Sequence, residues 1–166
     1  KADNRVQFHH AVNITRKFMK AVILDQDWDL ICPHTKEVKE TIKAKYLWEE
    51  ILETRSLTGE PYLFKIDHAN DALPQTQKDK GLKIKGSNIC IEICLPTDEE
   101  RTFVCCLSSL NMAKYDEWKD TSLVEDLTWY LDNVLQYFID NAGPELKKSV
   151  YSATMERAIG IGTLGW

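Results

Sequence analysis

Amphipathic helical stretches alternate with short extended runs along this chain, and this alternation limits the folds that it can adopt. The clearest helical stretch begins after Ser122 and ends at the sequence NAGP, residues 141–144. Ser122 and Glu125 have the spacing of a capping box, which marks a helix start. Apolar residues then recur every three or four positions, as on one face of a helix: Leu123, Leu127, Tyr130, Leu131, Val134, Leu135, Phe138 and Ile139. Helices that alternate with strands in this way predict an α/β fold.

Local signals predict the other elements. Residues 5–24 are expected to contain a helix that ends near Leu24. Thr35 is expected to cap a second helix, which runs to about Leu57 and stops at Gly59. The remaining predictions are an extended piece at DQDWDLICP (25–33), strands at PYLFKID (61–67) and TFVCCLSSL (102–110), a polar loop at HANDALPQTQKDKG (68–81), an amphipathic segment from Pro144 and a turn in GIGTLGW (160–166).

Composition and charge narrow the class of protein. With 166 residues, of which 43% are hydrophobic and 28% charged, the chain has the makeup of a single globular domain. Its net charge of -5 and the lack of a basic stripe argue against nucleic-acid binding. No apolar run reaches the roughly 20 residues of a membrane span, so no membrane partner is expected. An odd number of cysteines favours a reducing cytoplasm, the host's if a phage encodes the chain, over a secreted disulfide scaffold.

Two cysteines belong to the sequence SNICIEICLPT, residues 87–97, and two more follow closely at Cys105 and Cys106. Alternate residues of this stretch form an apolar series and a series of amide, carboxylate and thiol groups. If the stretch is a half-buried strand, Cys90 and Glu92 project to the same side, about 6–7 Å apart. The two series are Ile89, Ile91, Ile93 and Leu95, and Asn88, Cys90, Glu92 and Cys94.

The residues alone leave three interpretations of the cysteines open. As small core residues, Cys94 and Cys106 fit better than Cys90, which shares its side with polar groups. A zinc site is less favoured, because positions 90 and 94 of a strand lie about 13 Å apart, too far for one ion with bonds of ~2.3 Å. In a redox active site, Glu92 would act as general base beside Cys90, and Cys105 or Cys106 would supply a reducing thiol.

The same stretch carries a family resemblance. SNICIEICLPT, followed shortly by RTFVCCLSSLNM, resembles the paired active-site signature of the large, catalytic subunit of ribonucleotide reductase. FMKAV, DWDLICP, TRSLTGEPYLFKID, YDEW and ERAIGIGTLGW also resemble segments of that family, in family order. Among the classes of this family, the chain resembles class I, the aerobic diphosphate-reducing class, more than the cobalamin-dependent class II. The resemblance implies a ten-stranded α/β barrel with the radical cysteine on a central loop, so residues 88–92 are expected at a loop tip.

The resemblance also implies a radical mechanism, in which ribonucleotides are reduced to 2′-deoxyribonucleotides for DNA synthesis. Cys90 matches the cysteine that becomes a thiyl radical and removes the 3′ hydrogen of the ribose. Glu92 matches the base that takes the proton of the 3′ hydroxyl, and Asn88 matches the amide that hydrogen-bonds the substrate. Cys105 matches one half of the dithiol that reduces the intermediate and ends as a disulfide.

Further residues and partners follow from the same resemblance. Ser87 and Leu107 are expected to contribute to substrate binding, and Cys94 to have no catalytic role. The implied substrate is a ribonucleoside diphosphate. The implied partners are the rest of the catalytic subunit, a metal-containing small subunit that generates the radical, and thioredoxin or glutaredoxin as reductant. This chain itself is expected to bind no metal or other cofactor; in the class II alternative, adenosylcobalamin supplies the radical.

The resemblance sets the expected extent of the chain. Residues 1–166 are expected to be part of a single catalytic barrel domain, without the N-terminal effector regions and without the C-terminal part of the barrel. Alone, they are expected to be inactive, either as the product of a split gene or as a section of a longer protein. A non-catalytic remnant that keeps the motif is the alternative from a different class.

Overall fold

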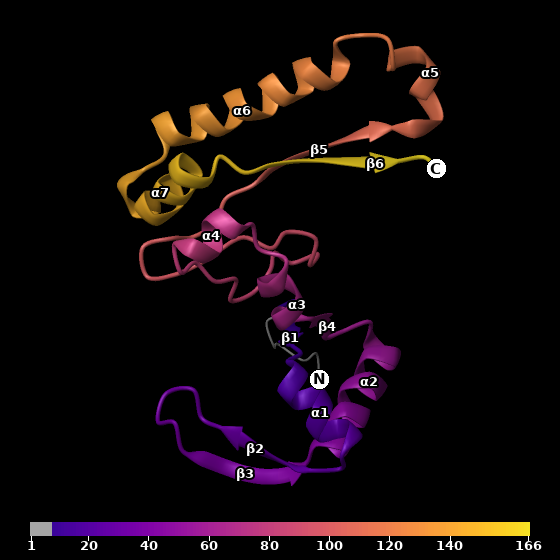
Figure 1. Ribbon diagram of the computed structural model, residues 1–166, viewed down its shortest axis with the longest axis vertical. Helices are drawn as coiled ribbons and strands as arrows, with labels where there is room; N and C mark the ends of the chain where they lie inside the picture. The colour runs from indigo at the N-terminus through magenta and orange to yellow at the C-terminus, as the bar shows by residue number, and fades with distance from the viewer. Residues whose placement is uncertain (1–7) are drawn as a thin grey trace, which may run out of the picture. The chain divides into compact units, whose positions relative to one another are not determined.

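Three separate pairs of strands make up the β structure that Figure 1 shows. The computed structural model describes residues 8–166. The chain divides into two compact units, of which the first ends at Cys94 and the second runs from Leu95 to Trp166. Helices and strands alternate in both units, as the α/β prediction requires. Among the described residues, none of the helices combines the length and the apolar character needed to cross a bilayer.

In the first unit, a parallel pair of short strands joins segments that are distant in the sequence. Strands β1 (Ala11–Asn13) and β4 (Tyr62–Phe64) form this pair. Helices α1 (Arg16–Ile23) and α2 (Ala44–Thr58) lie between them in sequence, with the antiparallel hairpin of β2 (Asp27–Ile31) and β3 (Val38–Lys43). Their core consists of Ile14, Phe18, Ala21 and Ala44, against which Trp28 and Trp48 pack.

Helix α1 begins and ends at residues suited to those positions. The Thr15 hydroxyl accepts a hydrogen bond from the amide of Phe18 at 3.0 Å, which satisfies one of the free donors at the helix start. Leu24 is the C-cap, and the next residue, Asp25, has a left-handed backbone with φ 51°. The predicted helix end near Leu24 is therefore confirmed.

The start predicted for the second helix is wrong. Thr35 lies in the turn of the β2–β3 hairpin, where its hydroxyl donates to the Glu37 carboxylate at 3.1 Å instead of capping a helix. Residues 38–43 pair with β2, and Lys43 forms an ion pair with Asp27 at 2.8 Å. Helix α2 starts only at Ala44. Its predicted end is correct, because Gly59 adopts φ 82° and donates its amide to the Arg55 carbonyl.

The segment predicted as a polar loop contains two short helices. Helix α3 spans Ile66–Asp71, and α4 spans Gln75–Asp79. Between them Leu73 is buried, and together with Phe64 and Ile84 it forms a second core in the first unit. The polar composition of residues 68–81 hid these helices, because both are too short to show a repeated apolar face.

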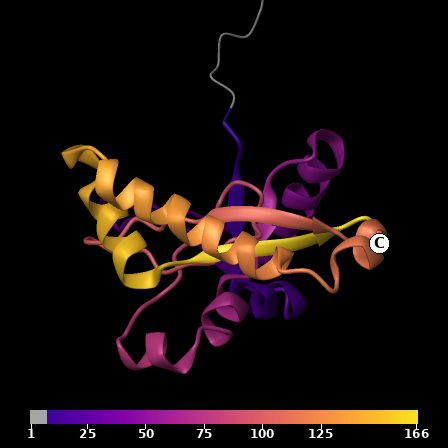
Figure 2. The same ribbon diagram turned by 90° about the horizontal axis from the view of Figure 1, so that it is seen from above.

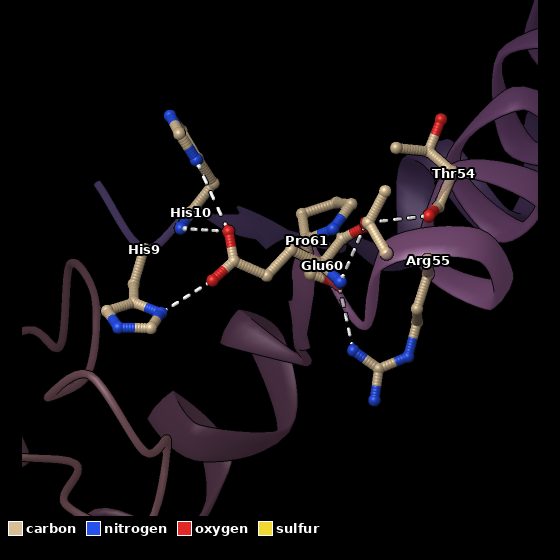
Figure 3. Close-up of polar contacts among 7 residues, drawn as sticks. His9, His10, Thr54, Arg55, Glu60 and Pro61 are labelled. Carbon is tan, nitrogen blue, oxygen red and sulfur yellow. Dashed lines mark hydrogen bonds and ion pairs between the residues drawn. The ribbon is translucent and has the colours of Figure 1, made fainter. Parts of the chain in front are cut away.

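Figure 3 shows how Glu60 ties the residues before β1 to the turn between α2 and β4. The Glu60 carboxylate accepts a hydrogen bond from His9 Nδ1 at 2.5 Å and lies 3.5 Å from His10 Nδ1. The hydrogen bond from His9 is the main cause that lowers the pKa of Glu60. Arg55 donates to the Pro61 carbonyl at 2.8 Å. These contacts hold β1 and β4 together at their amino ends.

The second unit is built on the parallel strands β5 (Cys106–Asn111) and β6 (Ile159–Leu164), with Cys106 opposite Ile159. Helix α6 (Leu123–Asn141) packs against both strands (Figure 2). Leu131 and Leu135 of this helix are buried. Helix α7 (Lys147–Glu156) leads back to β6. The connections are the 3-10 helices η1 (Met112–Lys114) and η2 (Pro144–Leu146) and the short helix α5 (Tyr115–Trp118).

Two predictions for the second unit need correction. The helix after Ser122 is present, but the Ser122 hydroxyl donates to the Asp126 carboxylate at 2.6 Å and forms no capping box with Glu125. The sequence GIGTLGW was predicted as a turn, yet most of it is strand β6. A Cβ at Gly160 would lie 2.5 Å from Cδ2 of Leu107 on β5, so a larger residue there would require the half-exposed Leu107 side chain to move.

Candidate active site

Residues 87–97 do not form the half-buried strand that their alternation predicts. No residue from 82 to 105 belongs to a helix or strand. Instead, the chain closes a small loop on Asn88, whose backbone amide donates to the Ile93 carbonyl at 3.3 Å. The Ile93 amide donates to Asn88 Oδ1 at 3.0 Å, and the Ile91 amide donates to the Asn88 carbonyl at 3.2 Å. The expectation of a loop tip, which came from the family resemblance, is confirmed.

This loop has an exposed side and a packed side that differ from the predicted faces. Cys90 and Glu92 are exposed, and so is Ile89, with 56% of its surface accessible. Ile91 and Cys94 pack against the second core, described above. Strand alternation assigned Ile89 to the buried face, which is wrong because the turn at 89–90 breaks the period of two. The loop nevertheless presents a thiol and a carboxylate, two residues apart, on its outer side.

Ile91 turns the loop between these two groups. Its backbone has φ 72°, in the left-handed region that a β-branched residue rarely occupies. Such a conformation costs of order 1–3 kcal/mol and persists only when the surroundings enforce it. Here the hydrogen bond to the Asn88 carbonyl and the packing of the Ile91 side chain enforce it.

The side-chain oxygen of Asn88 forms a hydrogen bond within the loop. Oδ1 accepts the Ile93 amide, which leaves the second lone pair of this oxygen and the two N–H donors of the amide group for other partners. The neighbouring Ser87 is half-buried, and its hydroxyl donates to the Asn88 carbonyl at 3.0 Å. The loop entrance is held by Asn13, which donates from Nδ2 to the Lys85 carbonyl at 3.0 Å. The structure thus brings Ser87, Asn88, Cys90 and Glu92 together in one short segment.

Cys94 and Cys106 are partly buried thiols. Burial, with a smaller contribution from the Glu92 carboxylate, raises the pKa of Cys94. Burial alone raises the pKa of Cys106. Because the thiolate is the reactive form of cysteine, both groups are less reactive than an ordinary thiol. This agrees with the interpretation of both as packing residues.

Cys105 and Leu107 lie at the start of strand β5 in the second unit. Cys105 immediately precedes the strand, and its thiol makes a weak hydrogen bond to the Cys106 carbonyl at 3.8 Å. Burial alternates along β5, so that Cys106 is half-buried whereas Leu107 is 50% exposed. Residues 105 and 107 have the period-two spacing that places them on one face of an extended chain.

An ion pair fixes the turn that precedes β5. The amides of Glu100 and Arg101 donate to Asp98 Oδ1 at 2.8 and 2.9 Å, and the first of these bonds is the main cause that lowers the pKa of Asp98. The Arg101 guanidinium donates to Glu156 Oε1, at the end of α7, at 2.7 Å. The Arg101 and Glu156 side chains are only 11% and 8% exposed. This pair is therefore shielded from water.

A second cluster of charges fixes the start of β6. Arg157 follows α7 with a left-handed backbone at φ 45°. It donates from Nε and Nη2 to Asp132 Oδ1 at 2.9 and 2.6 Å, and from Nη1 to Gln136 Oε1 at 2.6 Å. Asp132 and Gln136 belong to α6. Both strands of the pair are thus anchored to helices directly before they begin.

Several structural residues of the site escaped the sequence analysis. Asn13, Arg101 and Arg157 act through contacts with residues more than 20 positions away, and no local motif marks such contacts. The zinc interpretation finds no ligand set, since residues 8–166 contain no group of three or more His, Cys, Asp or Glu side chains that could hold a metal ion.

Comparisons with known proteins agree on one family. The family model described as "Ribonucleotide reductase, barrel domain" matches residues 2–166. The ribonucleoside-diphosphate reductase large subunit of Invertebrate iridescent virus 3 is 61% identical over 140 residues, which are 84% of this chain and 22% of that protein. A Frog virus 3 homologue is 53% identical over 164 residues, which cover 97% of this chain and 29% of the viral protein.

A solved structure gives the same result. The class Id ribonucleotide reductase alpha subunit of Actinobacillus ureae superposes with a TM-score of 0.80 at 36% identity, over 95% of this chain and 28% of that subunit. The chain thus spans less than a third of the length of these relatives.

Proposed function

This chain belongs to the ribonucleotide reductase barrel-domain family, and we propose that it forms part of the catalytic barrel of a ribonucleoside-diphosphate reductase. The family resemblance and the partial α/β barrel predicted from the sequence are confirmed by the match over residues 2–166 and by the superposition on a class Id alpha subunit. The proposed activity reduces ribonucleoside diphosphates to 2′-deoxyribonucleoside diphosphates for DNA synthesis. Residues 1–166 contribute to one barrel domain in this proposal.

The reaction assigns a separate task to each candidate residue. Cys90, as a thiyl radical, takes the 3′ hydrogen atom of the ribose and forms an S–H bond. Glu92 accepts the proton of the 3′ hydroxyl and returns it to the 3′ oxygen at the end of the cycle. The 2′ hydroxyl leaves as water after it takes a proton from the reducing dithiol. A dithiol that includes Cys105 supplies two electrons and two protons and becomes a disulfide. Cys90 then returns a hydrogen atom to C3′ and is again a radical, so atoms and electrons balance.

One structural observation carries this assignment: Cys90 and Glu92 lie on the exposed side of a loop whose backbone is closed internally by Asn88. A radical-carrying thiol must reach a substrate carbon directly, and a general base must lie within hydrogen-bond reach of its proton. A loop that exposes both groups leaves them accessible to a substrate.

The remaining candidates complete the proposed substrate site. Asn88 offers its amide N–H donors to the ribose hydroxyls, and its oxygen accepts the Ile93 amide. Ser87 supports Asn88 through the bond to its carbonyl. The half-exposed Leu107 provides apolar contact next to the reducing thiol, Cys105. These are proposals for the complete enzyme.

The proposed partners follow from the class I relatives. A small subunit that contains metal supplies the radical, the rest of the catalytic subunit completes the barrel, and thioredoxin or glutaredoxin reduces the disulfide. No residue of this chain is assigned to a resident cofactor. The similarity to a class Id alpha subunit favours a small subunit over adenosylcobalamin as the radical source.

A chimeric large subunit tests the proposal. In it, this chain replaces the homologous segment of the Invertebrate iridescent virus 3 large subunit, with which it shares 61% identity over the aligned residues. The chimera is assayed with the viral small subunit, a ribonucleoside diphosphate and a thiol reductant. We expect deoxyribonucleotide formation, its complete loss in Cys90→Ala, and at most one turnover in Cys105→Ala.

Cys32→Ala is the matched control, because Cys32 lies at the β2–β3 hairpin and has no assigned role. Reduction by Cys90→Ala at the rate of the unsubstituted chimera would reject the proposal. A chimera that folds and binds the small subunit, but is inactive with its cysteines intact, would favour the non-catalytic remnant instead.

A further inference from the structure

Asn70, at the end of helix α3, is hydrogen-bonded to the chain that leads into the Cys90 loop. Its Oδ1 accepts the amide of Ile84 at 2.9 Å, and its Nδ2 donates to the Ile84 carbonyl at 2.9 Å. The same Nδ2 donates to the Ile66 carbonyl within α3 at 3.0 Å. Both polar backbone groups of Ile84 are therefore satisfied by one side chain from a residue 14 positions earlier.

This pairing takes the place of a strand ladder. An irregular segment must find partners for its buried backbone groups, and an unsatisfied group is costly. Ile84 is 4% exposed and lies in the second core, so its amide and carbonyl are remote from water. Asn70 supplies both partners, in the manner of a residue on a neighbouring strand.

The core beneath the loop connects this anchor to Cys90. Ile84 belongs to the core with Phe64 and Leu73, and Ile91 packs against the same core beyond the loop tip. Cys90 therefore lies between two segments that share one support. The bond between Asn88 and Ile93 closes the loop but does not attach it to the unit, whereas Asn70 does.

We propose that Asn70 is a positioning residue for Cys90: it fixes the path of the chain at Ile84 and thereby sets the position of the thiol at the loop tip. The inference rests on the proposed function, in which Cys90 reacts with the substrate. Asn70 itself touches neither substrate nor reacting atoms in this role. A misplacement of about 1 Å in a reacting group lowers the rate of catalysis roughly 100-fold.

The test uses the chimeric large subunit with its small subunit and compares two substitutions. Asn70→Asp keeps the acceptor for the Ile84 amide but removes both donated bonds. Asn70→Ala removes all three. Since the displaced loop carries the reacting thiol, we expect kcat to fall, roughly 10-fold or more in Asn70→Asp and roughly 100-fold in Asn70→Ala, with a smaller rise in KM because Asn88 lies on the same loop.

Asn141→Ala is the matched control, because Asn141 donates only to the Tyr137 carbonyl on the exposed side of α6. We expect its kcat to equal that of the unsubstituted chimera. If Asn70→Ala fails to fold, the near-isosteric Asn70→Asp decides the question. Unchanged kcat in a folded Asn70→Asp, or a rise in KM without a fall in kcat, overturns the inference.

The Cys90 variant separates this inference from the proposed function. Full activity of Cys90→Ala would reject the function itself, whatever Asn70 does. Loss of activity in Cys90→Ala, together with full activity in both Asn70 variants, would reject only the positioning role.

Discussion

The two candidate cysteines are held in place by different forces. The loop that carries Cys90 is fixed by uncharged groups: side-chain amides bond the backbone, and Ile84 and Ile91 pack on an apolar core. The strand that follows Cys105 is fixed by charges, because Arg101 and Arg157 anchor the chain before β5 and β6. Amides do not titrate and are little affected by salt, whereas carboxylates respond to pH. We therefore expect the two regions to lose their structure under different conditions, and only the region before β5 and β6 to respond directly to pH.

The buried ion pair of the second unit should give the largest effect. Arg101→Ala removes the ion pair with the shielded Glu156 carboxylate and the ion pair with Asp98 at 3.2 Å, and we expect a loss of about 3 kcal/mol in the free energy of unfolding, the lower end for a broken buried pair. The substitution also removes the contact of the guanidinium with the Tyr151 ring, at 5.1 Å. Thermal denaturation of the chain, followed by circular dichroism, measures the loss.

Lys114→Ala is the control for that prediction. Lys114 and Glu117 form an exposed pair, with 59% and 66% of their side chains accessible, and such pairs contribute about 0–1 kcal/mol. Equal destabilisation by the two substitutions would show that the charges before β5 contribute no more than a surface pair, and the contrast between the two regions would then disappear.

A smaller effect is expected from the core beneath the Cys90 loop. Ile84→Ala removes most of a buried side chain, which costs roughly 2–5 kcal/mol, and we expect the lower end because the irregular loop can partly collapse into the space. The substitution should change the rate at which a small alkylating reagent modifies Cys90. It should leave the rate of modification of Cys105 unchanged. Mass spectrometry of the digested chain measures both rates. Equal changes at both thiols would mean that the two regions are coupled.

The smallest effect is a local response to acid. Interaction with the Glu100 and Arg101 amides lowers the pKa of Asp98 below its ordinary value of 3.8. The stabilisation is therefore complete above that value and is lost as the pH falls through the lowered pKa. At a pH below the lowered pKa of Asp98, hydrogen exchange should lose protection at the amides of Glu100 and Arg101, relative to neutral pH. The Ile84 and Ile93 amides, bonded by uncharged Asn side chains, should keep theirs.

Periodic sequence signals predicted some regular elements of both units and missed others. Helix α6 and the end of α2 follow from an apolar stripe and from Gly59, which are local features. Strand β3 was missed because Val38 and Ile42 fit a helical spacing as well as a strand. Pairing with β2, which the sequence does not display, decided between them.

The chemistry of the candidate site stays a prediction, and its geometry was predicted only in part. Alternation suggested a strand at 87–97, and the family resemblance suggested a loop tip, as the structure has it. The residues that fix this loop, Asn70 and Asn13, form contacts across 14 and 72 positions. Such contacts depend on how α3 and β1 pack, so no local pattern could indicate them.

Transfer of hydrogen from the substrate to Cys90 is the most direct test of the account. The chimeric reductase is incubated with a ribonucleoside diphosphate that carries tritium at C3′, and the radioactivity released into water is measured during turnover. We predict release with the unsubstituted chimera, because the abstracted atom resides on an exchangeable thiol, and none with Cys90→Ser. Equal release from both proteins would contradict the assignment of Cys90 as the group that removes the 3′ hydrogen.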